Sequence, residues 1–143
     1  MGGIAGKLTP QAGFIKLDPT GISRDQEVVL DYANDPYVFH GKTPARLGAE
    51  ALRIMQHIEN AAAMITLPII ILQGGSDSLV NPEGAQMFYE KAGSEDKTLK
   101  IYEGFYHEVF NEPEKGRVFG DIEKWLDRQL EPEKGRVNED IAT

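Results

Sequence analysis

Two short apolar runs, LPIIIL (67–72) and TLKIYE (98–103), stand out from the surrounding mixed sequence. The first run is continuous rather than alternating, which is typical of parallel strands covered by helices on both faces. Between them, residues 82–91 have the apolar spacing of a short helix. This order predicts a parallel α/β unit, and because two strands make a poor sheet, we expect further strands to lie beside them.

The longest amphipathic pattern precedes the first strand and covers residues 44–64. Thr43 is a good cap and Pro44 a good first helical residue, so together they predict the start of a helix. Its apolar positions recur at helical intervals and form one face. They are Leu47, Ala51, Ile54, Ile58 and Ala62.

Two further helices are predicted on either side of the second strand. Asn81 is a candidate cap for the helix over 82–91, in which Pro82 takes the first position. The last helix covers about 113–130, and its apolar face includes Trp125, which we expect in the core.

The two ends of the chain show no sustained period. Residues 1–43 are rich in Gly, Pro and Asp, and we interpret them as irregular cover. The segment from Glu131 onward is charged and aperiodic, and we expect it to be frayed. It contains a second copy of EPEKGRV, at 131–137 after 112–118, which we interpret as a local duplication that lengthens an exposed tail.

Charge and composition narrow the classes of partner. The 143 residues carry a formal net charge of −8, from 23 acidic and 15 basic side chains. This argues against nucleic acid as a partner, because phosphate binding needs clustered Lys and Arg. With no cysteine, no readable targeting signal and no apolar stretch near the roughly 20 residues that span a bilayer, we expect a cytoplasmic protein without a transmembrane segment.

Asp77 is the first candidate for chemistry. It follows the first strand through Gly74-Gly75-Ser76, a turn that would expose its carboxylate at the carboxyl end of the sheet. There it could hold a histidine in one tautomer and stabilise the imidazolium. An Asp beside Ser and Gly after a strand is also common turn chemistry, so a turn-capping role remains an alternative.

The position of His107 favours the catalytic role of Asp77 over the turn-capping role. It stands 30 residues after Asp77, just past the second strand, so both side chains should emerge at the same edge of the sheet. A histidine opposite an acid is a candidate general base. His40 and His57 have no such setting, and the sequence offers no metal-ligand cluster, so we expect neither a metal nor another cofactor.

The serine that would complete such a set is missing. No G-x-S-x-G turn, which lifts a nucleophilic hydroxyl between a strand and a helix, occurs in the chain. Ser76 has Ser78 where the closing glycine should stand, and it lies beside the acid rather than opposite the base. We interpret Ser76 as a turn residue; Ser23, Ser78 and Ser94 are weaker candidates still.

The segments PIIILQGGSDSLVNPEGA and DKTLKIYEGFYHEVFNEPE carry a family resemblance. From about Asp31 to Leu130 the chain resembles the C-terminal portion of the monoacylglycerol lipase and lysophospholipase-like α/β-hydrolases, grouped with the serine aminopeptidases (S33). The resemblance implies that Asp77 is the orienting acid and His107 the base of a serine–aspartate–histidine triad. It also implies that Leu79 and Val80 line an acyl pocket, although simple packing under the next helix is an equal alternative.

The same resemblance implies a partial α/β-hydrolase fold, made of a cap segment plus the last two parallel strands and their helices. Residues 1–64 would be part of the cap with its connecting helix, 65–130 the C-terminal core segment, and 131–143 a charged tail. The serine and the oxyanion-hole glycines belong to the N-terminal half of such proteins.

Two functions follow as hypotheses. In the first, Asp77 and His107 activate a serine supplied by an N-terminal half chain or a longer parent protein, and the substrate is a small acyl ester resembling a monoacylglycerol or a lysophospholipid. In the second, the chain is an inactive fragment that forms a homo-oligomer through the exposed edge of its small sheet. A third reading, a dyad with Ser76 or another local hydroxyl, would need unfamiliar geometry.

Overall fold

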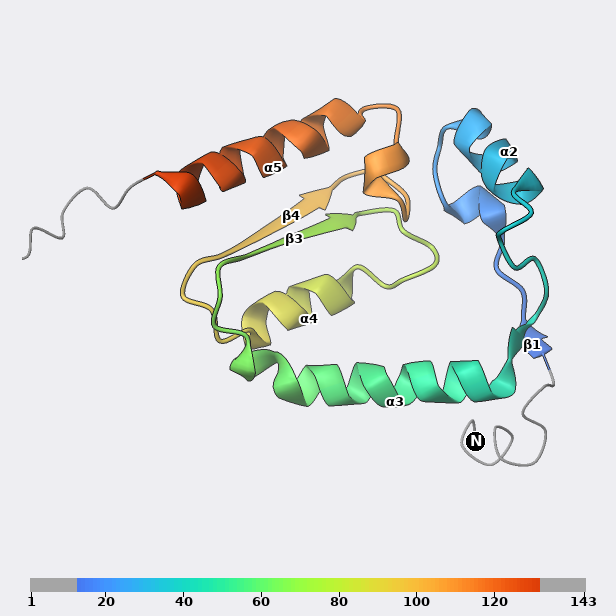
Figure 1. Cartoon of the computed structure of the whole chain (residues 1–143), viewed down its shortest axis with the longest axis horizontal. Coiled ribbons are helices and arrows are strands. Elements are labelled where there is room, and N and C mark those ends of the chain that lie inside the picture. Colours follow the sequence, from blue (N-terminus) through green and yellow to red (C-terminus); the bar gives the residue numbers. More distant parts are fainter. Residues whose placement is uncertain (1–12, 132–143) are drawn as a thin grey trace, which may run out of the picture.

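The computed structural model describes residues 13–131. Its elements are arranged around a small parallel sheet with a helix on each face (Figure 1). In chain order they are β1 (Gly13–Ile15), η1 (Pro19–Gly21), α2 (Gln26–Asn34), β2 (Thr43–Pro44), α3 (Ala45–Ala61), η2 (Ala62–Met64), β3 (Ile69–Gly74), α4 (Glu83–Lys91), β4 (Lys97–Tyr102), η3 (Val109–Asn111) and α5 (Lys115–Leu130).

The predicted strand, helix, strand, helix order is confirmed. Strands β3 and β4 pair in parallel, in register from Ile69 beside Lys97 to Gly74 beside Tyr102. Helix α4 lies on one face of this sheet and α5 on the other (Figure 1). Within residues 13–131 no further strand joins the pair, so the sheet has two strands in the described part of the chain.

The core lies between the sheet and α5. Tyr102, Phe105, Val109 and Val118 are all buried, and the rings of Tyr102 and Phe105 stack with centroids 5.3 Å apart. The prediction that Trp125 belongs to this core is only half correct. Its ring is partly exposed and borders a hollow of about 290 Å³, while its indole nitrogen is enclosed without a hydrogen-bond partner in the described residues.

The start of α3 differs from the prediction. Thr43 does not cap the helix, because it pairs with Ile15 in a small antiparallel sheet, and Pro44 stands at the cap position without a side-chain bond. Asn81 comes closer to its expected role, since its Oδ1 accepts a hydrogen bond from the Glu83 amide at the start of α4, 3.1 Å away. Helix α5 begins two residues later than expected.

The region interpreted as irregular cover contains a regular helix, α2. Its start is capped by Asp25, whose carboxylate accepts a hydrogen bond from the Glu27 amide. The prediction failed because nine residues are too short for apolar periodicity to show, whereas the aspartate cap was readable. The predicted frayed tail and the second EPEKGRV copy lie, apart from Glu131, outside the described residues.

Candidate active site

Asp77 sits in the turn that follows β3, with its side chain almost fully buried. One carboxylate oxygen, Oδ1, accepts hydrogen bonds from the backbone amides of Leu79 (2.8 Å) and Val80 (3.0 Å). The other, Oδ2, accepts from Nε2 of Gln73 and lies 2.9 Å from Nδ1 of His107. Each oxygen of the buried carboxylate therefore has two hydrogen-bond partners.

These contacts set the charge of the carboxylate. Burial by itself raises the pKa of Asp77, because an enclosed charge is poorly solvated. The hydrogen bonds from His107, the Val80 and Leu79 amides and Gln73 outweigh burial and leave the pKa below its ordinary value. Asp77 is thus an anion at neutral pH.

Backbone contacts bring residues 105–112, the His107 loop, against the turn that holds Asp77. The amide of Gly75 donates to the carbonyl of Tyr102 (2.8 Å), and the amide of Ser76 donates to that of Phe105 (2.9 Å). Gly74 is required by this approach, since a Cβ atom there would lie 2.0 Å from the carbonyl oxygen of Tyr106. The prediction that acid and histidine meet at the carboxyl ends of parallel strands is confirmed by their 2.9 Å contact.

The orientation of His107 leaves one ring nitrogen for chemistry. Nδ1 faces Asp77, and because an ionised carboxylate can only accept a hydrogen bond, Nδ1–H donates to it and the lone pair of the neutral ring lies on Nε2. In the described residues Nε2 has no hydrogen-bond partner, and the side chain is 40% exposed. Such a pair can accept a proton from a nearby hydroxyl and return it to a leaving group.

The serines of the described segment do not meet this base. The buried hydroxyl of Ser23 donates to the carbonyl of Asn111, and that of Ser94 donates to the carbonyl of Asp96. Ser76 is exposed and its amide is used by the loop contact just described. Within residues 13–131 no serine hydroxyl is hydrogen-bonded to His107.

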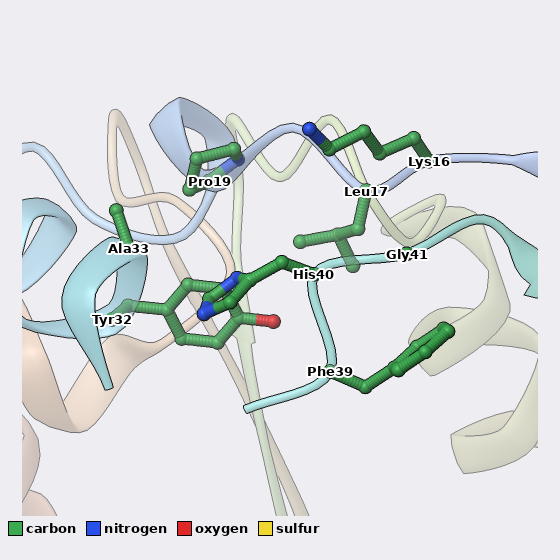
Figure 2. A pocket seen from close by; sticks show the side chains of 8 residues that line it. All are labelled: Lys16, Leu17, Pro19, Tyr32, Ala33, Phe39, His40 and Gly41. Atoms are coloured by element: carbon green, nitrogen blue, oxygen red, sulfur yellow. The ribbon is translucent and has the colours of Figure 1, made fainter. Parts of the chain in front are cut away.

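The other histidines lie in different settings. His40 meets Tyr32 edge to face at 6.1 Å and contacts the carbonyl of Asp35, on the wall of a hollow of about 170 Å³ near α2 (Figure 2). His57 is exposed on α3. In the part of the chain that the structure describes, no cluster of side chains could hold a metal ion, and no helix is long and apolar enough to cross a membrane.

Sequence reasoning did not single out Gln73, Arg24 or Glu112. Gln73 is the second donor to Oδ2 of Asp77, and Glu112 is a fully buried carboxylate paired with Arg24. A polar residue inside an apolar strand was the readable signal for Gln73. Arg24 and Glu112 gave no local signal, because 88 residues separate them.

The chain is similar in sequence to known proteins over most of its length. A family model described as serine aminopeptidase, S33, matches residues 1–114. A monoacylglycerol lipase of Mycolicibacterium smegmatis is 40% identical over 123 residues, which are 86% of this chain and 44% of that protein. The human monoglyceride lipase is 34% identical over 124 residues, 85% of this chain and 41% of that protein.

Structural comparison agrees. The crystal structure of Paleococcus ferrophilus monoacylglycerol lipase superposes with a TM-score of 0.78 at 32% identity, covering 87% of this chain and 49% of that one. The chain thus spans about half the length of the relatives it matches. It belongs to the serine aminopeptidase S33 family and folds as part of an α/β-hydrolase.

Proposed function

We propose that this chain provides the acid–base half of a serine hydrolase that cleaves carboxylic esters, with Asp77 as the orienting acid and His107 as the base. The observation that carries the proposal is the 2.9 Å contact between Oδ2 of Asp77 and Nδ1 of His107, with the histidine side chain 40% exposed. The S33 family membership supports a hydrolase, and because the chain has no G-x-S-x-G turn, the proposal places the serine on another segment.

In the proposed reaction, Nε2 of His107 takes the proton of the serine hydroxyl as its oxygen attacks the ester carbonyl. Asp77 stabilises the imidazolium that forms. When the carbon–oxygen bond of the ester breaks, the imidazolium gives its proton to the departing alcohol, and an acyl-enzyme remains. Water then attacks the acyl-enzyme by the same route, which releases the fatty acid and restores the serine.

The substrate proposal rests on the relatives. Those compared above are named monoacylglycerol or monoglyceride lipases, so we propose a small acyl ester of that kind, with a lysophospholipid as the alternative head group. Leu79 and Val80 stand beside Asp77 and are proposed to contact the acyl chain. The cytoplasmic location remains part of the proposal.

The first experiment measures the intact mass of the purified chain after treatment with a fluorophosphonate, which labels activated serines. We expect no adduct from the chain alone. Co-expression with a chain that carries the G-x-S-x-G half should give an adduct on the partner and turnover of p-nitrophenyl esters. His107→Ala should abolish both, while the matched control His57→Ala, on an exposed helix face, should retain them. A partner chain that brings no gain in esterase activity contradicts the proposal.

One observation favours a second function, that of a self-associating module without catalysis. In the described residues β3 pairs only with β4, so it has a free parallel edge, and such edges invite pairing with another chain. This alternative predicts a homo-oligomer in sedimentation experiments and an unchanged His107→Ala variant in every assay. A monomer that turns over esters once the partner is present excludes it.

A further inference from the structure

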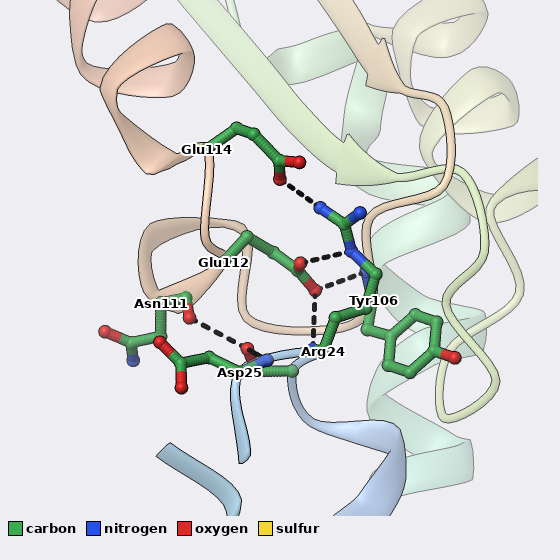
Figure 3. A network of polar contacts seen from close by, with 7 residues as sticks. Arg24, Asp25, Tyr106, Asn111, Glu112 and Glu114 are labelled. Carbon is green, nitrogen blue, oxygen red and sulfur yellow. Dashed lines mark hydrogen bonds and ion pairs between the residues drawn. The ribbon is translucent and has the colours of Figure 1, made fainter. Parts of the chain in front are cut away.

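Glu112 is the most deeply buried carboxylate of the described chain, with no exposed side-chain surface. An ionised carboxylate in such a position is costly unless donors surround it. Three donors do so here. Oε2 accepts from Nε of Arg24 at 2.6 Å, and Oε1 accepts from the backbone amides of Tyr106 (2.8 Å) and Arg24 (3.3 Å), as Figure 3 shows.

Arg24 belongs to a segment far away in the sequence that lies along the His107 loop. The guanidinium sits over the ring of Phe105, 5.0 Å from its centroid. The carbonyl of Ile22 accepts from the amide of Glu108 (2.8 Å), and the carbonyl of Gly21 accepts from that of His107 (3.4 Å). Residues 21–24 thus lie against one side of the His107 loop.

His107 therefore stands between two anchored neighbours. The Tyr106 amide is held by Glu112, and the Glu108 amide is held by the carbonyl of Ile22. On the opposite side the Tyr106 carbonyl is pressed against Gly74. With the backbone fixed on both sides, only the side-chain torsions of His107 remain free, and the bond to Asp77 selects among them.

We infer that Glu112 and Arg24 are positioning residues for His107, which keep Nδ1 on Asp77 and Nε2 free. The inference rests on the proposed role of His107 as the base. It assigns the ion pair between the buried Glu112 and the partly exposed Arg24 to the orientation of that base rather than to stability alone, since the cost of taking the carboxylate out of water offsets much of the attraction.

Glu114 supplies a matched control. It also pairs with Arg24, through Nη2, but its side chain is half exposed, and in the described structure it makes no hydrogen bond to the backbone beside His107. Glu112→Gln and Glu114→Gln thus make the same chemical change at two partners of one arginine, and only the first removes a charge from the loop.

The test measures the tautomer of His107 by ¹⁵N NMR of the purified chain, in the neutral imidazole, which needs no nucleophile. The parent and Glu114→Gln should show the Nδ1–H form. In folded Glu112→Gln the fraction of that form should fall at least about twofold, because the loop no longer holds the ring on Asp77. An unchanged tautomer in folded Glu112→Gln overturns the inference.

Arg24→Lys covers the case in which Glu112→Gln does not fold. It keeps a cation beside Glu112 but loses the two-armed guanidinium, so it should also lower the Nδ1–H fraction, and a folded Arg24→Lys with the parent tautomer overturns the inference. With the nucleophile half present, Glu112→Gln should lower kcat by about tenfold to a hundredfold at unchanged KM. A parent without turnover would instead refute the proposed function, while the tautomer measurement keeps its meaning.

Discussion

The His107 loop and helix α3 use their side chains in opposite ways. The loop is irregular apart from the single turn η3, yet Phe105 at its start is 1% exposed and Glu112 at its end is fully buried. Helix α3 is regular and amphipathic, yet its apolar stripe is open, with Leu47 60% and Ile54 49% exposed. Regular structure and burial are therefore separate properties of this chain.

The difference has a physical cause. A helix forms from hydrogen bonds within its own segment, so α3 can be regular without any surface against its stripe. The loop has only a few internal hydrogen bonds, such as that from the Asn111 amide to the Glu108 carbonyl (2.8 Å), and its shape depends also on contacts with β3, α5 and residues 21–24. An open apolar stripe of this kind marks a surface suited to a partner.

Removing the buried ring of Phe105 should have the largest effect on stability. Phe105→Ala should lower the free energy of unfolding by roughly 3–5 kcal/mol, because it leaves a cavity beneath Tyr102 and Val118. Urea unfolding followed by circular dichroism measures it. Phe39→Ala makes the same change at a ring that is 72% exposed, and should cost far less. Equal losses of unfolding free energy from the two variants would contradict the contrast between a buried and an exposed ring.

Adding a methyl group at Gly74 tests the contact between the Asp77 turn and the His107 loop. The added Cβ would lie 2.0 Å from the Tyr106 carbonyl oxygen, so backbone must move, and Gly74→Ala should cost about 1–3 kcal/mol of unfolding free energy. Gly120→Ala in α5 is the control, since its Cβ meets nothing within 4 Å and should stabilise the helix by about 0.5–1 kcal/mol. A Gly74→Ala variant as stable as the parent would show that the backbone at Gly74 does not lie this close to the Tyr106 carbonyl.

The pH dependence of unfolding tests the Asp77 contacts. Because the folded-state pKa of Asp77 is lowered, its contribution to stability is present above the unfolded pKa of about 3.9 and is lost as the pH falls through the folded pKa. The stability difference between the parent and Asp77→Asn should therefore shrink as the pH falls below about 4. Parallel curves in acid, measured by urea titration, would contradict this.

The smallest effect is expected on α3. Ile54→Ser and Ile58→Ser should each change the unfolding free energy by only about 0.5 kcal/mol, because these side chains are already nearly half exposed to solvent. The same urea titration checks this. A loss as large as that of Phe105→Ala would show that the stripe is covered in solution, for example by a second copy of the chain.

Local patterns in the sequence were enough for several elements. The isoleucine run predicted β3 to within two residues, and the spacing of Asp77 and His107 predicted their contact. Trp125 shows the limit, since its apolar face predicted a helix correctly but overstated its burial. Helix periodicity says which side chains share a face, and only a partner surface decides whether that face is enclosed.

The EPEKGRV segment at 112–118 also shows how little a local sequence pattern says about contacts. Its first copy places Glu112 beside Arg24, the guanidinium of Arg117 5.6 Å from the Phe105 ring centroid, and Val118 in the core. None of these contacts follows from the seven letters, which occur again in the tail. They depend on Arg24, Phe105 and the core residues that meet the segment, which the seven letters do not specify.

By itself the sequence determined the α/β order, the acid and histidine at the ends of successive strands, and the lack of a nucleophile turn. These depend on short-range patterns and on the direction of parallel strands. The tertiary structure alone decided that Gln73 shares the Asp77 carboxylate, that residues 21–24 wall the His107 loop, and that Glu112 is buried on Arg24. The last two sets of contacts join residues far apart in the chain, and the energies of all three depend on burial, which no local pattern encodes.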